Sequence, residues 1–357
     1  MADTATFALV GSIIAIALVF DYTNGFHDAA NAIATAVGSK ALSPRVALAI
    51  AALGNLAGAF ISTSVAGTVG SGIIAPPSGT SGLLVVLAGL VGAIAWNLIT
   101  WWFGLPSSSS HALIGGLAGA MIASSPVAAL TFSPEATVLW GGIFTKVVIP
   151  MILSPIIGFS LAYLLALAIL WLFRNANRER STPGFKLGQA LASGVMALGH
   201  GLQDAQKTMG VITLALIVGG IQAQPEVIDG VTQAPEIQTW VKIAAAVAIS
   251  LGTWAGGWRI MATLGRKVTQ MDLPRGFAAQ TVASTVLYVM AIKFAAPIST
   301  THTITSSILG AGATRGRKHV KWGVVQTILG AWVLTFPAAA LIAAISHFII
   351  AGVFGAF

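Results

Sequence analysis

Long apolar runs separated by short polar segments dominate the pattern of hydrophobic and polar positions along this chain. The runs fall roughly at 5–37, 45–70, 82–105, 107–124, 136–173, 186–221, 239–264, 277–296, 298–313 and 322–350. Several exceed the roughly 20 residues that an α-helix needs to cross the hydrocarbon core of a bilayer. We therefore predict an all-α polytopic membrane protein. For the runs at 5–37, 136–173 and 186–221 we expect helices that are broken, tilted or extended beyond the bilayer.

Composition narrows the class of protein further. The 357 residues are 56% hydrophobic and only 8% charged, whereas soluble domains carry about 25% charged residues. The apolar runs leave no room for a sizeable soluble domain. Cysteine is absent, which excludes a disulfide framework and a thiolate metal site.

Basic residues gather in four places, and their positions predict the topology. The four basic clusters are Lys40 and Arg45; Arg174, Arg178, Arg180 and Lys186; Arg266, Lys267 and Arg275; and Arg315, Arg317, Lys318 and Lys321. The segments 71–81, 125–135 and 222–238 contain no Lys or Arg. The positive-inside rule therefore puts the four clusters in the cytoplasm and both termini outside. We expect the protein in the cell inner (plasma) membrane. The net charge of +8 is then a topology signal, and nucleic acid is excluded as a partner.

Four pairs of motifs recur in the same order in the two halves of the chain. "NGFHDAANA" at 24–32 aligns with "HGLQDAQKT" at 200–208, and "PSSSSH" at 106–111 aligns with "PISTTH" at 297–302. "LGNLAGA" at 53–59 aligns weakly with "LGTWAGG" at 251–257, and Trp140 and Pro155 match Trp322 and Pro337 at one common offset. Four matches in register indicate an internal repeat.

The charge-derived topology makes the two repeats inverted. The first element of repeat 1 runs from outside to inside, and its counterpart at 186–221 runs from inside to outside. Two inverted-topology repeats with interrupted helices are the architecture of secondary transporters, with binding sites near the midplane. We assign 1–173 to membrane repeat 1, 174–185 to a cytoplasmic linker and 186–357 to membrane repeat 2.

Two pairs of apolar runs leave their own topology open. Each of the pairs 82–105/107–124 and 277–296/298–313 forms either two full crossings or a re-entrant hairpin. Either arrangement returns the chain to the side of the membrane from which it came, so the positions of the charges do not distinguish them. The motifs "PSSSSH" and "PISTTH", which we call the Ser/Thr tips, each lie between the two apolar runs of a pair. Because these tips are polar, we favour re-entrant hairpins.

The predicted spans contain a few ionisable residues, chiefly Asp21, Asp28, Asp204 and Lys207. Each costs roughly 2.5–3.5 kcal/mol at the centre of a membrane helix on insertion scales, so an intramembrane charge is a functional hypothesis by default. The turn pair Asn24-Gly25 predicts a break in the first helix. The structural alternative is that the polar residues around Gly25 merely cap this break.

The two Ser/Thr tips offer hydroxyl groups where new helices begin. The tip residues are Ser108, Ser109, Ser110, Ser299, Thr300 and Thr301. A helix N-terminus supplies free N–H groups and a positive dipole end, which suit an oxyanion. The alternative is simple N-capping, but two such tips together favour anion binding. The roles of His27, His111, His200 and His302 stay open between packing, hydrogen bonding and proton transfer.

These motifs resemble the Pit family of inorganic phosphate transporters, over nearly the whole chain. The resemblance implies an inverted-repeat membrane protein that imports phosphate with H⁺ or Na⁺, in bacterial members also as a neutral metal–phosphate complex. By position it implies substrate contacts at the two tips, Asn24 and Gln203. It implies ion coupling by Asp28, Asn31, Asp204 and Lys207, and binding of a co-transported divalent cation such as Mg²⁺ by Asp28 and Asp204. No resident cofactor is expected, and a homodimer is compatible with these features.

One departure from the family pattern bears on the coupling ion. Sodium-coupled members tend to have Asn-Asp-x-x-Asn in both repeats, whereas repeat 2 reads "QDAQK", with Lys207 at the position of Asn31. An ammonium group there could replace a bound sodium ion or pair with Asp204 three residues before it. This form is similar to the proton-coupled branch, so we predict symport with H⁺.

Four alternatives are weighed against a proton-coupled phosphate symporter. Sulfate or another oxyanion could be the substrate, but two aspartates favour phosphate, which can donate hydrogen bonds to a carboxylate. Na⁺ could be the coupling ion, and a passive channel would not transport against a gradient. An intramembrane hydrolase using Ser109 or Ser110 with His111 is remote, because adjacent helical residues do not face each other. We therefore expect a transporter and not an enzyme.

Overall fold

The computed structural model describes residues 3–71, 73–74, 76–125, 144, 147–228 and 231–354. The first half contains α1 (Thr4–Gly38), α2 (Pro44–Gly58), α3 (Ser64–Ser71), α4 (Thr80–Phe103), α5 (Ser109–Ser124) and α7 (Ile149–Leu172). The second half contains α8 (Arg178–Val218), α9 (Thr239–Ala255), α10 (Trp258–Ala262), α11 (Leu273–Tyr288), α12 (Thr300–Ala313) and α13 (Trp322–Phe354). The described residues also form the short π-helices η2 (Thr263–Lys267) and η3 (Val289–Lys293) and a 3₁₀ turn η4 (Arg317–His319). The predicted landmark Trp140 lies outside the described residues.

The regular secondary structure of the described residues is helical apart from one small β-hairpin and an isolated β-bridge between Thr269 and Val320. Strands β1 (Val227–Ile228) and β2 (Val231–Thr232) pair antiparallel in the loop before α9. Helices α1, α4, α7 and α13 each have the length and apolar composition to cross a membrane. Large apolar side chains such as Leu164 on α7 and Val333 on α13 are exposed on the outer surface, which fits a surface that faces lipid. The all-α membrane architecture is therefore confirmed.

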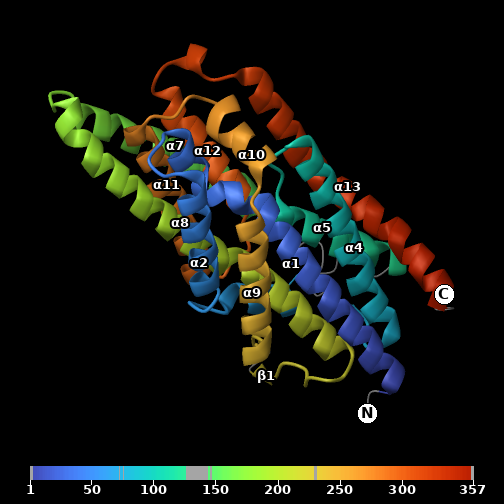
Figure 1. Cartoon of the computed structure of the whole chain (residues 1–357). Helices are drawn as coiled ribbons and strands as arrows, with labels where there is room; N and C mark the ends of the chain where they lie inside the picture. The colour runs from blue at the N-terminus through green and yellow to red at the C-terminus, as the bar shows by residue number, and fades with distance from the viewer. Residues whose placement is uncertain are drawn as a thin grey trace.

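The two repeats are interleaved, as Figure 1 shows. Helix α2 of repeat 1 packs against α8 of repeat 2, and α9 packs against α1 in the equivalent way. The last helix of each repeat packs on the other repeat, so that α13 contacts α4 and α5 while α7 contacts α11 and α12. Every one of these contacts has a counterpart with the repeats exchanged, as two inverted-topology repeats require.

Gly25 does not break the first helix, so the expectation of a break at Asn24-Gly25 is wrong. Helix α1 is continuous through this pair. The glycine is needed for close packing instead, because a Cβ at Gly25 would collide with the carbonyl oxygen of Ile249 on α9. Gly201 on α8 meets the carbonyl oxygen of Asn55 on α2 in the same way. The repeated glycine therefore lets a neighbouring backbone approach α1 and α8. We call these two helices, which contain the motifs "NGFHDAANA" and "HGLQDAQKT", the signature helices.

The helix interruptions lie elsewhere, at the weakly aligned "LGNLAGA" and "LGTWAGG" motifs. Helix α2 ends at Gly58 and α3 begins at Ser64. Helix α9 ends at Ala255, and the chain bends by 58° before it continues through α10 and η2. Gly256 has φ +81°, a left-handed conformation that glycine adopts without strain.

Two helical hairpins bring the Ser/Thr tips into the interior. Helix α4 packs against α5, and α11 packs against α12. The tips meet where the His111 and His302 rings contact each other, with ring centroids 4.7 Å apart. Trp332 of α13 stacks on His302 and donates from Nε1 to the carbonyl oxygen of Pro106 at 2.9 Å. These contacts support the interpretation that the two matching histidines pack between the repeats.

The segment assigned to the linker is largely helical. Helix α8 begins at Arg178, so that residues 178–185 form its first turns, and Asn177 caps it by accepting from Glu179 N–H at 2.8 Å. A cavity of about 610 Å³ at this end is lined by Lys40, Arg178 and Arg315, together with Asp272. Asp272 is ion-paired with Arg275 at 2.5 Å. The four basic clusters therefore converge at one end of the molecule.

Candidate functional site

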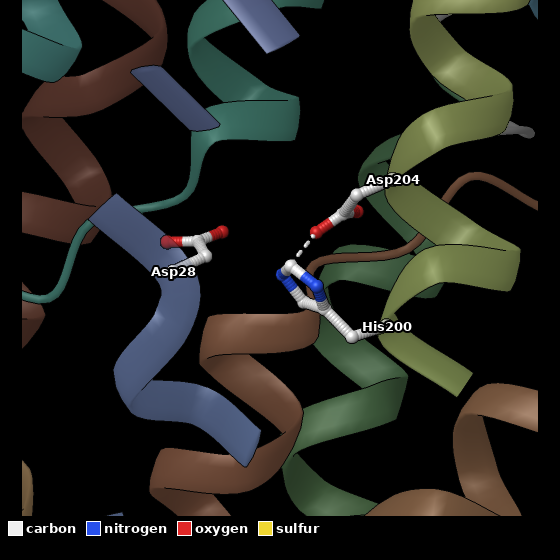
Figure 2. Close-up of side chains that lie close together, drawn as sticks. All are labelled: Asp28, His200 and Asp204. Carbon is white, nitrogen blue, oxygen red and sulfur yellow. Dashed lines mark ion pairs between the residues drawn. The ribbon is translucent and has the colours of Figure 1, made fainter. Parts of the chain in front are cut away.

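Three ionisable side chains from the two signature helices converge in the interior, as Figure 2 shows. Asp28 projects from α1, and His200 and Asp204 project from α8, one helical turn apart. Each offers one ligand atom, and these atoms all lie within 4.8 Å of one another. None of the three residues is more than 2% exposed. The aspartates predicted from the two repeats therefore lie in one buried cluster, and His200 joins them.

Lys207 joins this cluster to the tips of both hairpins. Its ammonium group lies 2.5 Å from Asp204 Oδ1 and 2.5 Å from Ser110 Oγ at the start of α5. It also donates to the carbonyl oxygen of Ile298, before α12, at 2.9 Å. The pairing with Asp204 that the sequence spacing suggested is present. A buried ammonium group thus has three oxygen partners, which compensate for its loss of hydration.

Asn31 makes the equivalent contacts from α1. Its Nδ2 donates to Thr301 Oγ1 at 2.9 Å and to Thr300 Oγ1 at 3.3 Å. The hydroxyl of Thr301 in turn donates to Asp28 Oδ1 at 3.3 Å, and that of Thr300 donates to Asp204 Oδ2 at 3.1 Å. Each signature helix is therefore bound to the hairpin tip of the other repeat.

Each aspartate has its own histidine partner. His27 Nδ1 lies 2.7 Å from Asp28 Oδ1, and its Nε2 lies 3.0 Å from Thr100 Oγ1 on α4. His200 Nε2 lies 2.9 Å from Asp204 Oδ2, and its Nδ1 lies 3.0 Å from Asn55 Oδ1 on α2. The His27 ring has a hydrogen-bonding partner at each nitrogen, and the His200 ring has one at Nδ1 and an ion-pair contact at Nε2, so polar contacts hold both rings in position.

The remaining predicted substrate residues fall into three groups. Ser108 and Ser299 are N-caps, whose hydroxyls accept from the N–H groups of His111 and His302 at 3.1 Å. Gln203 donates to the carbonyl oxygens of Leu287 and Ala296 at 3.4 and 3.3 Å, and thereby anchors the second hairpin.

The third group consists of Ser109 and Asn24, each of which has a buried oxygen atom without a hydrogen-bond partner among the described residues. These atoms are Ser109 Oγ and Asn24 Oδ1. Such atoms are the natural contacts for a ligand, because burial without a partner is costly.

Sequence reasoning missed the histidine partners and the polar pair behind them. The roles of His27 and His200 are open in the sequence, which does not pair either ring with an aspartate, but the i, i+4 spacing of His200 and Asp204 could have revealed their contact. Asn55 Nδ2 donates to Thr253 Oγ1 at 2.6 Å, and these residues occupy the same position of the two interrupted motifs. The sequence signal for this pair is the alignment of the two motifs, because equivalent residues of two symmetry-related repeats can meet at the axis between them.

Comparison with known proteins bears on what this buried cluster does. A model of the phosphate transporter family matches the chain twice, at residues 24–183 and 173–343. A protein of Bacillus subtilis (strain 168) is 42% identical over 96% of this chain and 97% of its own length. A protein of Rhizobium meliloti (strain 1021) is 43% identical over 98% of both chains. Each is named a "Probable low-affinity inorganic phosphate transporter".

A solved structure shares the fold. It is described as "The sodium-dependent phosphate transporter", aligns with a TM-score of 0.80 over 96% of this chain and 99% of its own, and is 23% identical. At this level of sequence identity the similarity supports a shared fold and nothing more. The relatives and this neighbour are transporters and not enzymes. The double match and the full-length relatives show that this chain belongs to the phosphate transporter family.

Proposed function

We propose that this protein imports inorganic phosphate across the cell inner membrane by symport with H⁺. Family membership and the names of the full-length relatives support phosphate as the substrate. The buried cluster between two inverted repeats supports a binding site at the midplane, which alternating access exposes to one side at a time.

The contacts of Lys207 favour H⁺ over Na⁺ as the coupling ion. Its ammonium group has oxygen partners from Asp204, Ser110 and Ile298. Carboxylate, hydroxyl and carbonyl oxygens are the ligands that a hard cation would need. A covalently tethered cation therefore occupies the position where repeat 1 has neutral Asn31, and a sodium ion would have to displace it.

Phosphate would bind where the two hairpin tips meet. Ser109 Oγ is free to donate, and the N-termini of α5 and α12 supply N–H groups and positive dipole ends. In this structure Ser110, Thr300 and Thr301 bond to the signature helices instead. Substrate binding would exchange these internal bonds for bonds to phosphate oxygens, and one repeat would then rock against the other.

A metal–phosphate complex is a second candidate for the transported species. Asp28, His200 and Asp204 could together bind a divalent ion, since their ligand atoms lie within 4.8 Å of one another. Two carboxylates suit Mg²⁺, and the imidazole suits a transition metal such as Mn²⁺ or Zn²⁺ better. The ion would be cargo, and Lys207 beside Asp204 would weaken its binding by charge repulsion.

The convergence of the basic clusters at one end supports the orientation predicted from sequence. With this end in the cytoplasm both termini are outside, as the positive-inside rule requires. A homodimer stays a prediction from sequence, which chemical cross-linking of the purified protein in vesicles can test.

Uptake of labelled phosphate into proteoliposomes tests the function. An imposed inward proton gradient should drive uptake without Na⁺, and an imposed sodium gradient alone should not. Excess arsenate should compete and sulfate should compete poorly. Dependence on sodium with indifference to the proton gradient would contradict the coupling, and strong competition by sulfate would contradict the substrate. Uptake enhanced by Mg²⁺ or Mn²⁺ in proportion to bound metal would favour the complex.

A further inference from the structure

Asp21 is a buried carboxyl group that the contacts described so far do not use. It lies on α1, is 0% exposed, and neither of its oxygens makes a hydrogen bond with the described residues. Asp21, Asn24, Asp28 and Asn31 follow one another at steps of three and four residues, so they share one face of α1. Asp21 thus lies on the helix face of the substrate site but nearer the N-terminal, outer end of the helix.

Two other polar groups near Asp21 also lack partners. The side chain of Thr208 on α8 approaches the carboxyl group, and Thr208 Oγ1 makes no hydrogen bond with the part of the chain that is described. Asn24 Oδ1, one turn along α1, has none either. Unpaired buried polar groups are rare in folded proteins and call for an explanation such as an absent ion.

Within the part of the chain that the structure describes, the surroundings of Asp21 offer no free positive charge. Asp204 and Lys207 of α8 are the charged groups that act on it, and Lys207 is already bonded to Asp204. Helix α4 contains no ionisable residue, and α9 contains one, Lys242, in its first turn. An ionised carboxylate in this place would be a buried and uncompensated charge. A neutral, protonated carboxyl group avoids this cost.

Asp28 and Asp204 differ from Asp21 in this respect. Asp28 has His27 and Thr301 as partners, and Asp204 has Lys207, His200 and Thr300. Both carboxyl groups therefore have polar partners that compensate for burial, and Asp204 also has the Lys207 ammonium group. They are thus suited to contact a cation or the substrate, and Asp21 is the carboxyl group left to carry a proton.

We propose that the Asp21 carboxyl group, beside Asn24 and Thr208, is the binding site of the co-transported proton and is separate from the phosphate site. This inference rests on the proposed symport and deepens it. The repeat offset of 176, which relates Asp28 to Asp204, places Ala197 opposite Asp21, so repeat 2 has no second copy of the site. One such proton site per chain follows.

Lys207 links the proton to the movement of the hairpins. When Asp21 releases its proton to water on the cytoplasmic side, the O–H bond breaks and a carboxylate anion remains. This anion competes with Asp204 for the Lys207 ammonium group. Because Lys207 also holds Ser110 and the carbonyl of Ile298, its displacement weakens the contacts of both hairpin tips with α8. Release of the proton thus favours reopening of the site.

The variant Asp21→Asn tests this assignment in proteoliposomes, since Asn imitates the protonated acid in shape and cannot lose the proton. With the membrane voltage clamped, an inward gradient of one pH unit should let wild-type protein accumulate labelled phosphate about tenfold if one proton accompanies each phosphate. Asp21→Asn should only equalise the concentrations while it retains phosphate–phosphate exchange. Asp21→Glu should restore accumulation. Asp3→Asn makes the same change at the exposed N-cap of the same helix and should behave as wild type.

The outcomes separate this assignment from the symport. A wild-type protein that ignores the proton gradient contradicts the symport, and the assignment with it. Proton-driven accumulation that persists in Asp21→Asn contradicts the assignment alone. Should Asp21→Asn fail to insert, Thr208→Val provides a second test. Loss of this hydroxyl should make the carboxylate harder to form, so the half-maximal pH of uptake should rise. An unchanged pH profile contradicts the assignment.

Discussion

The ammonium group of Lys207 on α8 lies 2.5 Å from the hydroxyl of Ser110 at the start of α5. Asn31 on α1, the counterpart of Lys207, bonds to Thr301, the counterpart of Ser110, at 2.9 Å. The two signature helices therefore hold each other's hairpin tips in a crosswise pair of contacts. Lys207 is charged, whereas its counterpart Asn31 is neutral. This difference between two equivalent positions of the repeats is the basis of the proposed proton coupling.

Lys207→Asn should make the protein sensitive to sodium. The change restores the symmetric pattern and leaves the Asp204 carboxylate without its cation, and breaking a buried ion pair costs about 3–5 kcal/mol. A sodium ion can then take the vacant place among the oxygen atoms. We expect the melting temperature of the detergent-solubilised variant to rise in NaCl relative to choline chloride at equal ionic strength. Wild-type protein is the control, and an equal response of both proteins would contradict the proposed role of Lys207.

Asp28→Asn and Asp204→Asn should both abolish phosphate uptake, but they should differ in stability. Asp204→Asn leaves the Lys207 charge buried and unpaired, which should cost about 3–5 kcal/mol. Asp28→Asn leaves His27, which can be neutral, so its cost should be nearer 1–3 kcal/mol, typical of a buried hydrogen bond that loses its partner. Thermal unfolding and uptake, measured on the same preparations, check both points. Wild-type transport by both variants would refute the site.

Gly25→Ala and Gly201→Ala should destabilise the protein by similar amounts. A Cβ at either position collides with backbone, at Ile249 on α9 or at Asn55 on α2. Overpacking of this kind costs about 1–3 kcal/mol, and backbone cannot move aside as a side chain can. The midpoint of thermal unfolding measures the effect.

Two glycines of the same helices provide matched controls for this prediction. Gly11 lies on α1 and Gly184 on α8, and a Cβ at either meets nothing within 4 Å. Alanine at these helical positions should be neutral or stabilising by about 0.5–1 kcal/mol. Equal destabilisation by all four substitutions would show that close helix packing is not the reason for the two repeated glycines.

The membrane class, the repeat and the two aspartates of the buried cluster could be predicted from sequence, because each leaves a local signal. Asp28 and Asp204 were identified because a charge within an apolar run is costly unless it is used. The order of the motifs and the charge asymmetry predicted the inversion. The pairing of Lys207 with Asp204 followed from their helical spacing.

The interleaving of the repeats could not be predicted, because it depends on contacts between distant segments. Asn24-Gly25 has the composition of a turn, yet the approach of α9 gives Gly25 a packing role inside a continuous helix. His200 and Asn55 meet only because α2 of repeat 1 packs on α8 of repeat 2. Local propensity contains no information about such partners.

The ion pairs at the basic end should make stability sensitive to acid. Partial burial would raise the pKa of Asp272, but the Arg275 N–H group and the guanidinium groups of Arg275 and Arg315 hold this pKa below its ordinary value. Stability from this network is therefore fully present above the pKa of the unfolded chain and is lost as the pH falls through the lower folded-state pKa.

Asp272→Asn should remove this dependence. Because the pairs are only partly buried, we expect a loss of about 1 kcal/mol at neutral pH and convergence with wild type at acidic pH. Thermal unfolding as a function of pH checks the prediction, and parallel curves for the two proteins would contradict it.

Opposed ion gradients test the proton-coupled phosphate symport most directly. Proteoliposomes loaded with labelled phosphate at equal concentration on both sides, with the voltage clamped, receive an inward proton gradient and an outward sodium gradient of equal size. Proton symport predicts net movement of phosphate into the vesicles, and Asp28→Asn should abolish it. Net movement out of the vesicles, along the sodium gradient, would contradict the account.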